Sequence, residues 1–240
     1  MSILSSVIKT ARSPFVTAVI VAGGSGTRFG GDKLMAELAG EPVLVHTLRA
    51  FHNSPMIQEI ILVTREEVMT DMARLCKIHG FTKVSVVVAG GASRAMSSYA
   101  GVMAASEKAG IIAIHDGARP LVTEKIIQDA IWKAYRYTSA VPAIPVKDTI
   151  KKAEKGIVTE TPKRDDLFAV QTPQCFHADL IRAALADAVK NAPEVTDDCM
   201  AVERIGGKIH LTESSEENIK ITTPLDLAMA EIILKGRNNS

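Results

Sequence analysis

The sequence predicts an α/β fold with a doubly wound, mostly parallel sheet of the Rossmann-like kind. Short apolar runs rich in β-branched residues alternate with amphipathic segments over the first 120 residues. Polar residues do not alternate with the apolar ones in these runs, and such continuous apolar runs are typical of strands buried on both faces of a parallel sheet. The chain has 240 residues, 47% of them apolar, which is enough to form a sizeable core without disulfides or metal.

Each element follows from its local pattern. Strands are expected over residues 17–22, 59–64, 84–88, 111–115 and 139–144. Helices are expected over residues 42–54, 66–79, 93–108, 123–136, 178–190, 197–204 and 224–235. Pro42 suits a first helical turn, and Gly80 and Gly110 suit positions just after a last turn. We expect a single domain, residues 1–240, that begins with a loose leader over residues 1–15.

Residues 146–167 interrupt this alternation. The segment is polar and charged, and it has no apolar residues at helical spacing. Short stretches with β-branched residues lie on either side of Lys155-Gly156. This pattern predicts an extended β-hairpin that protrudes as an arm. Long polar excursions from a domain usually serve a function or contact a partner. A solvated hairpin without a special role is the alternative.

The composition excludes several classes of protein. Lys plus Arg number 28 and Asp plus Glu number 27, so the net charge of +1 argues against a nucleic-acid or anionic-membrane binder. The apolar residues are dispersed, with no run long enough for a membrane helix. Three cysteines without close spacing indicate reduced thiols, and hence a cytoplasmic protein.

A glycine-rich loop, residues 22–28, follows the first strand and reads Ala-Gly-Gly-Ser-Gly-Thr-Arg. Backbone N–H groups of such loops can bind phosphate. Phe29 breaks a dinucleotide fingerprint, and Lys33 lies outside a Walker pattern. Arg28 and Lys33 would suit a triphosphate that gains charge as pyrophosphate leaves. A tight turn with solvated charges is the alternative.

Three more segments carry polar groups. Residues 90–98 follow a strand and read GGASRAMSS, residues 114–120 read IHDGARP, and residues 217–224 read ENIKITTP. Asp116 ends a buried strand, where substrate and metal sites of parallel sheets gather, although a capped turn would also explain it. Lys220 lies in an extended piece, and a buried lysine there would need an anionic partner such as a phosphate.

In this order and spacing, these segments resemble the 2-C-methyl-D-erythritol 4-phosphate cytidylyltransferase family of sugar-phosphate nucleotidyltransferases. Residues 145–149, 171–174 and 196–197 also match its pattern, so the resemblance covers about residues 16–235. One departure concerns the first loop. The family generally has a proline before the lysine and a longer spacing from the arginine, whereas here Asp32 precedes Lys33.

The resemblance implies a role for each matching residue. Catalytic roles fall on Arg28, Lys33 and Lys220. CTP binding falls on Ala22, Gly23, Gly24, Ser25, Gly26, Thr27, Gly91, Ala92 and Ser97, with Arg94 supporting the second loop. Binding of the acceptor falls on Asp116, Arg119, Thr149, Arg164, Thr172 and Thr196, and binding of Mg²⁺ on Asp116 and Glu217.

The reaction implied is transfer of CMP from CTP to 2-C-methyl-D-erythritol 4-phosphate, with Mg²⁺ as cofactor. It gives 4-diphosphocytidyl-2-C-methyl-D-erythritol and pyrophosphate in non-mevalonate isoprenoid biosynthesis. The resemblance also implies a homodimer in which the arm, residues 146–167, reaches the neighbour's acceptor site. Two alternatives stay open: a ribitol-5-phosphate cytidylyltransferase, and a nucleotide-binding regulator without turnover, suggested by the short Arg28–Lys33 loop.

Overall fold

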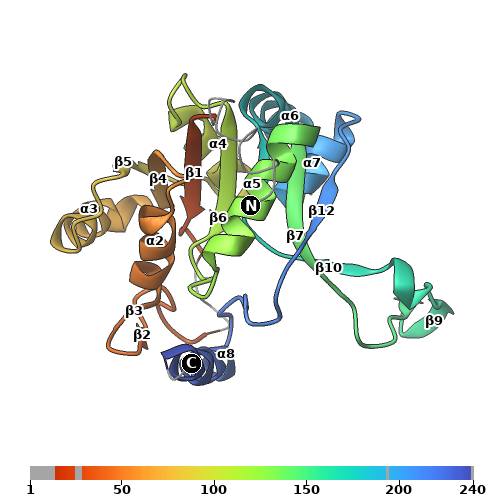
Figure 1. Cartoon of the computed structure of the whole chain (residues 1–240). Helices are drawn as coiled ribbons and strands as arrows, with labels where there is room; N and C mark the ends of the chain where they lie inside the picture. Colours follow the sequence, from red (N-terminus) through yellow and green to blue (C-terminus); the bar gives the residue numbers. More distant parts are fainter. Residues whose placement is uncertain (1–13, 25–28, 193–194, 239–240) are drawn as a thin grey trace, which may run out of the picture.

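The computed structural model describes residues 14–24, 29–192 and 195–238. An eight-stranded sheet with helices on both faces forms its centre (Figure 1). Its strands are β1 (Val16–Val21), β4 (Glu59–Thr64), β5 (Val84–Ala89), β6 (Ile111–Asp116), β7 (Ser139–Pro145), β10 (Phe168–Val170), β11 (Gln174–His177) and β12 (His210–Glu213). The expected leader falls mostly on residues 1–13, which lie outside the described residues.

The order of the strands confirms the predicted doubly wound topology. Across the sheet it is β10-β7-β11-β6-β1-β4-β5, with β12 paired to β7. β1 runs parallel to β4 on one side and to β6 on the other, and β4 runs parallel to β5. β11 lies antiparallel between β6 and β7, and β10 lies antiparallel to β7. β10, β11 and β12 were not expected, because three or four residues are too few to show a period.

Helices cover both faces of the sheet. They are α2 (Val43–Asn53), α3 (Met69–Ile78), α4 (Arg94–Ala104), α5 (Glu124–Tyr137), α6 (Ala178–Asn191), α7 (Asp198–Arg204) and α8 (Pro224–Asn238). Side chains of α2, α3 and α5 form one core with Ile20 of β1, and side chains of α4, α6 and α7 form a second core with Val19. Because alternate residues of a strand face opposite ways, β1 is buried on both faces, as predicted.

Two predicted boundaries and one burial pattern are corrected. The helix expected over 93–108 ends at Ala104, because Ala105 adopts an extended conformation with ψ 143°. The segment 66–79 begins with a short 3₁₀ turn, η1 (Glu66–Val68), before α3. β5 is an edge strand, so Val86 is 39% exposed instead of buried.

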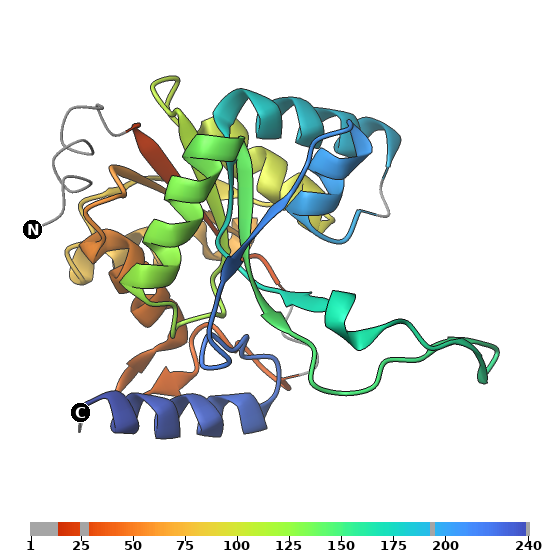
Figure 2. The ribbon, with the colours of Figure 1, turned by 45° about the vertical axis from the view of Figure 1, so that its right-hand side comes forward.

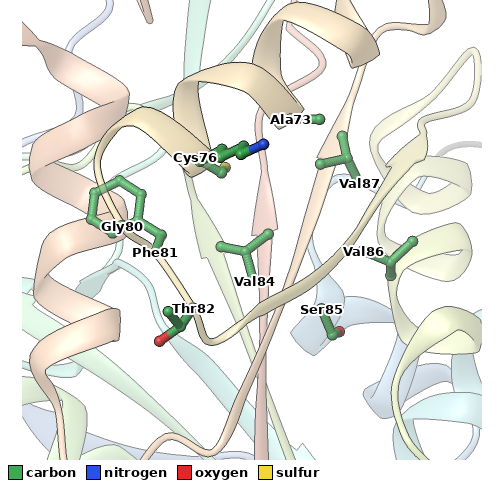
Figure 3. Close-up of a pocket in the computed structure, with 10 residues that line it drawn as sticks. Ala73, Cys76, Gly80, Phe81, Thr82, Val84, Ser85, Val86 and Val87 are labelled. Atoms are coloured by element: carbon green, nitrogen blue, oxygen red, sulfur yellow. The ribbon is translucent and has the colours of Figure 1, made fainter.

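A hollow lies between α3 and the edge strand β5 (Figure 3). It has a volume of about 320 Å³ and a largely apolar lining that includes Phe81, Val84 and Val87. Its cysteine, Cys76, is buried, and burial raises the pKa of its thiol to about 11. The thiol is therefore protonated near neutral pH and is a poor nucleophile.

In the described part of the chain, no helix is long and apolar enough to cross a membrane.

α8 and a small hairpin form a separate layer, which lies below the central sheet and its helices in the view of Figure 2. The hairpin consists of β2 (Glu37–Leu38) and β3 (Glu41–Pro42). Leu38 packs there with Leu121, Ile221 and Ala230, all fully buried or nearly so. This layer fixes the segment before α8, in which Lys220 lies.

The predicted arm is present and extends far from the sheet (Figures 1 and 2). It contains β8 (Lys152–Glu154), β9 (Ile157–Glu160) and the 3₁₀ turn η2 (Arg164–Asp166). The paired strands are shorter than the predicted pieces, since residues 148–151 form no strand. Lys155 and Gly156 have φ of 50° and 82°, which is the turn geometry that glycine favours.

Candidate active site

Three polar loops meet at the carboxyl ends of β1, β5 and β6. The chain passes from β1 to β4 on one side and returns to β6 on the other, so the space beyond β1 and β6 is a topological switch point. Ligands of open α/β sheets bind at such points. Hence the topology alone favours a binding site between residues 22–24, 90–94 and 116–118.

A cavity of about 350 Å³ occupies this position. Nine of the predicted site residues line it: Ala22, Gly23, Gly24, Lys33, Gly91, Ala92, Ser97, Asp116 and Lys220. Arg94, Ser93 and Leu34 complete much of the remaining wall. The predicted Ser25, Gly26, Thr27 and Arg28 lie outside the described residues.

Asp116 is the electrostatic centre of the cavity. Its Oδ2 lies 2.9 Å from Lys220 Nζ and 3.5 Å from Arg119 Nε, and its Oδ1 lies 3.3 Å from Arg94 Nη2. Burial alone would raise the pKa of this carboxyl, but the three cations outweigh burial and hold the pKa well below its ordinary value. Asp116 is therefore ionised at any physiological pH.

Lys220 differs in one respect from the prediction, because it is not a buried lysine. Its side chain is 39% exposed, and only its tip contacts Asp116. The sequence pattern could not reveal this, since residues 218–222 form no strand and the exposure of Lys220 depends on the segments around it. A lysine of this kind can exchange its carboxylate for a bound anion at low cost.

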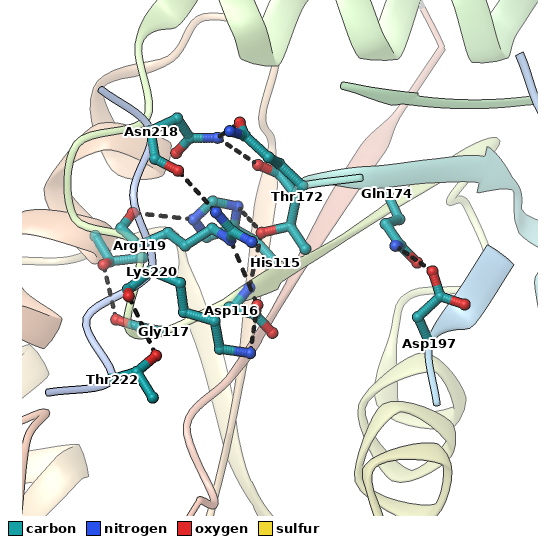
Figure 4. Close-up of polar contacts among 12 residues, drawn as sticks. His115, Asp116, Gly117, Arg119, Thr172, Gln174, Asp197, Asn218, Lys220 and Thr222 are labelled. Atoms are coloured by element: carbon teal, nitrogen blue, oxygen red, sulfur yellow. Dashed lines mark hydrogen bonds and ion pairs between the residues drawn. The ribbon is translucent and has the colours of Figure 1, made fainter. Parts of the chain in front are cut away.

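Asn218 anchors the segment that carries Lys220 (Figure 4). Its buried amide donates hydrogen bonds to Gln171 Oε1 at 2.8 Å and to the Thr172 carbonyl at 3.1 Å. Arg119 Nη1 donates to the Asn218 carbonyl at 2.7 Å. Thus Arg119, predicted to bind the acceptor, holds both Asp116 and the Lys220 segment in place.

The loop after β5 is preshaped by its own polar groups. Ser93 caps α4 by accepting the Met96 N–H, and Ser97 Oγ accepts the Gly91 N–H at 3.2 Å and donates to the Ser93 carbonyl at 2.9 Å. At Gly91 a Cβ would lie 2.3 Å from Met96 Cβ, so only glycine fits there. Arg94 Nη1 donates to Asp198 Oδ2 at 2.7 Å.

His115 takes part in a chain of hydrogen bonds behind Asp116. Burial lowers the pKa of His115 to about 3, so its imidazole is neutral. Nε2 lies 3.2 Å from the Arg119 carbonyl and must donate to it, which leaves Nδ1 to accept the Thr172 hydroxyl at 2.9 Å. Thr172 Oγ1 in turn accepts the Asp116 N–H at 3.2 Å. A histidine committed in this way is a structural group and not a free base.

Besides Arg119, five predicted residues of the described chain lie outside the lining of the cavity. Thr149 and Arg164 are exposed on the arm, where Arg164 Nη1 donates to the Lys147 carbonyl at 3.3 Å. Thr196 is exposed just before α7, and Thr172 is buried with its hydroxyl engaged as above. Glu217 pairs with Arg237 of α8 at 2.9 Å. Their predicted roles in binding acceptor or metal stay predictions.

Three residues of the polar network were not among the predicted site residues. Asp198 holds Arg94, Asn218 anchors the Lys220 segment, and Gln174 binds the first turn of α7. The acidic pair Asp197-Asp198 was the available signal for the first, but an acidic pair at a helix start normally indicates only a cap. The other two are polar residues whose partners are distant in sequence.

Comparison with known proteins agrees with this geometry. A family model described as "IspD: 2-C-methyl-D-erythritol 4-phosphate cytidylyltransferase" matches residues 16–236. The relative of that name from Alkaliphilus oremlandii is 43% identical over 225 residues, covering 92% of this chain and 95% of the relative. The one from Caldanaerobacter subterraneus is 44% identical over 224 residues, covering 92% and 99%.

Solved structures show the same fold. The crystal structure of 4-diphosphocytidyl-2C-methyl-D-erythritol synthase from Anaerococcus prevotii matches with a TM-score of 0.84 and 30% identity, covering 93% of this chain and 99% of that one. The Thermus thermophilus 2-C-methyl-D-erythritol 4-phosphate cytidylyltransferase matches with a TM-score of 0.75 and 28% identity, covering 90% and 98%. The chain therefore belongs to the 2-C-methyl-D-erythritol 4-phosphate cytidylyltransferase family.

Proposed function

We propose that this protein transfers CMP from CTP to 2-C-methyl-D-erythritol 4-phosphate. The observation that carries the proposal is the cavity at the switch point, where a glycine loop, a preshaped second loop and Lys220 surround one space. Family membership names the reaction, and this cavity is of a size that suits a nucleotide. The products would be 4-diphosphocytidyl-2-C-methyl-D-erythritol and pyrophosphate.

In this reaction an oxygen of the acceptor's phosphate attacks the α-phosphorus of CTP, and the bond from that phosphorus to the oxygen of the leaving pyrophosphate breaks. The attacking group is already an anionic oxygen, so no strong base is needed. His115 is neutral and fully hydrogen-bonded, which fits this requirement. Catalysis would come from positioning and from cations that stabilise the charge that develops on the phosphates, namely Lys33, Lys220 and, outside the described residues, Arg28.

Choice of the base would rest on the loop over residues 90–97. Gly91, Ala92 and Ser97 line the cavity with main-chain groups and small side chains, and Ser97 and Ser93 hold the loop in one shape. A rigid pocket of this size would accept cytosine and exclude purines mainly by their bulk.

Mg²⁺ forms part of the proposal. No group of three or more His, Cys, Asp or Glu side chains that could hold a metal occurs among the described residues. Magnesium at nucleotide sites commonly has one or two protein carboxylates, together with phosphate oxygens and water. The ionised Asp116 fits that requirement, and its partner Lys220 could turn to the phosphates. When bound, the ion would neutralise charge on the triphosphate.

A homodimer is also proposed, with the arm of one subunit completing the acceptor site of the other. The arm extends away from the sheet (Figure 2), and neither Thr149 nor Arg164 lines the cavity of its own subunit. Ile157 and Val158 on the arm are 72% and 55% exposed, which favours burial of this hairpin against a second chain. A guanidinium and a hydroxyl would suit the acceptor's phosphate.

A pyrophosphate-release assay tests the proposed function. We expect turnover with CTP plus 2-C-methyl-D-erythritol 4-phosphate, and poor turnover when ATP or GTP replaces CTP. Faster turnover with ribitol 5-phosphate would show that the acceptor is misassigned. Binding of CTP without turnover on either acceptor would indicate a regulator, and equal rates with purine nucleotides would refute the assignment of the 90–97 loop.

A further inference from the structure

Asp198 is a buried carboxylate for which the proposed reaction gives no role. It lies in the first turn of α7 and is 1% exposed. Its Oδ2 accepts the hydrogen bond from Arg94 Nη1, whereas its buried Oδ1 has no hydrogen-bond partner in the described part of the chain. A buried carboxylate that is only half satisfied is costly for stability. Its presence beside a site therefore points to a task in that site.

Its partner, Arg94, is shared between two carboxylates from different parts of the fold. Nη1 lies 2.7 Å from Asp198, and Nη2 lies 3.3 Å from Asp116. Arg94 is the first residue of α4 and lines the cavity just after the Gly91–Ser93 loop. A planar guanidinium with one carboxylate on each side has little freedom to turn. The two contacts therefore fix the end of the loop that is proposed to bind cytosine.

Asp198 is itself held rigidly from the sheet. Gln174 Oε1 accepts the N–H groups of Asp198 at 3.0 Å and Cys199 at 3.1 Å. Gln174 Nε2 donates to Asp197 Oδ2 at 2.9 Å, as Figure 4 shows. Since Gln174 belongs to β11 and pairs with Ile114 of β6, the first turn of α7 is attached to the strand that ends in Asp116. The carboxylate of Asp198 is thus a fixed point against which Arg94 is placed.

We propose that Asp198 is a positioning residue that acts through Arg94 to keep the 90–97 loop in its nucleotide-binding shape. The inference rests on the proposed function for the identity of the nucleotide. Loss of the Asp198 charge would leave Arg94 with Asp116 as its one carboxylate partner among the described contacts. The guanidinium would then turn toward Asp116 and pull the loop away from its present position. The bonds from Gln174 would still hold the α7 turn.

The test is the dissociation constant of CTP, measured by isothermal titration calorimetry without acceptor. In Asp198→Asn, we expect CTP to bind about tenfold more weakly, the scale of one lost hydrogen bond to a charged group. The matched control is Glu203→Gln, which removes a charge from an exposed side chain of the same helix and does not touch Arg94. Its CTP affinity should stay within about twofold of wild type.

A double-mutant cycle separates positioning from a general structural effect. Arg94→Lys keeps one charge but cannot reach both carboxylates, so it should weaken CTP binding as well. If Asp198 acts through Arg94, the double variant should bind CTP no more weakly than the weaker single variant. If Asp198→Asn alone proves unstable, Arg94→Lys gives the test by itself because it keeps the buried carboxylate, and an unchanged CTP dissociation constant in that variant would overturn the inference.

Turnover by wild type reports on the proposed function, whereas CTP affinity reports on Asp198, so the two can fail separately. For the positioning role, the expected result is also a KM for CTP that rises more than the KM for the acceptor. An unchanged CTP dissociation constant in folded Asp198→Asn, or independent effects of the two substitutions, would overturn the inference whatever wild type does with the acceptor.

Discussion

Lys220 Nζ lies 2.9 Å from Asp116 Oδ2, and this contact joins the segment before α8 to the carboxyl end of β6. The two residues are 104 positions apart in the sequence, yet both line one cavity. The carboxylate holds the lysine where an incoming phosphate would meet it. The lysine, in turn, helps to keep the carboxylate ionised.

The first prediction concerns His115. The variant His115→Gln should keep kcat within about tenfold of wild type, because a Gln amide can still donate to the Arg119 carbonyl and no base is lost. A loss of 10³-fold or more, a general-base magnitude, would contradict the structural role. The measurement is pyrophosphate release with CTP and the acceptor.

The lowered pKa of His115 also predicts how the free energy of unfolding depends on pH. The folded protein holds the pKa of His115 near 3 against an ordinary 6.5, so the unfolded chain binds the extra proton as pH falls. The contribution of His115 is therefore present above about pH 6.5 and is lost as pH falls toward 3. Relative to His115→Gln, the free energy of unfolding of wild type should drop by about 1 kcal/mol from about pH 6.5 to about pH 5.5. Urea unfolding measures it, and equal slopes would refute it.

A second residue, Asn218, should matter for both stability and rate. Asn218→Asp keeps the shape of the side chain but removes the amide that donates to Gln171 and Thr172. We expect a loss of about 2 kcal/mol in the free energy of unfolding, and a lower kcat because the Lys220 segment loses its anchor. Asn191→Asp on α6 is the control, since that asparagine is exposed. Equal behaviour of the two variants would show that the anchor does not matter.

The glycine at position 91 gives a further prediction. A Cβ there would lie 2.3 Å from Met96 Cβ, so Gly91→Ala must displace the loop that lines the cavity. We expect the KM for CTP to rise about tenfold or more, with a smaller change in the KM for the acceptor. Gly236→Ala is the matched control, because a Cβ there meets nothing within 4 Å. An unchanged KM for CTP in Gly91→Ala would remove this loop from the nucleotide site.

The arm can be tested by mixing subunits. Arg164→Ala should raise the KM for the acceptor far more than that for CTP. If the arm crosses to the partner, a mixed dimer of Arg164→Ala and Arg28→Ala has one site with both arginines intact. With statistical exchange, roughly a quarter of wild-type activity should return, as two-fold symmetry requires. Purified mixed dimers as inactive as both parents would show that Arg164 does not act across the dimer.

Much of the fold could be predicted because long helices and strands show a clear pattern of apolar residues. The strands at 59–64 and 111–116 and the helices α2 and α5 lie within a residue or so of their expected bounds. The short strands could not be predicted, since β10 is three residues long and is defined by its pairing with β7. The carboxyl ends of parallel strands meet at one edge, which is why residues of three separate loops were predicted together and found in one cavity.

The network behind the cavity could not be predicted in the same way. The residues next to Asp198 and Asn218 in the sequence form no distinctive motif. The partners that make these two side chains important, Arg94 and Gln171, lie 104 and 47 positions away. Lys220 was interpreted as a buried lysine in an extended piece, but its side chain is 39% exposed. Such features depend on how segments cross in space, and no local pattern encodes them.

The kcat of Lys220→Ala for pyrophosphate release, at saturating CTP and 2-C-methyl-D-erythritol 4-phosphate, tests most directly whether CMP is transferred in this cavity. Removal of one preorganised cation from the phosphates should lower kcat about 10²-fold or more, with a much smaller effect on folding. Lys235→Ala, an exposed lysine of α8 beside Glu231, is the matched control and should keep wild-type kcat. Lys33→Ala should fall between the two. A kcat for folded Lys220→Ala close to wild type would contradict the claim that this cavity is where CMP is transferred.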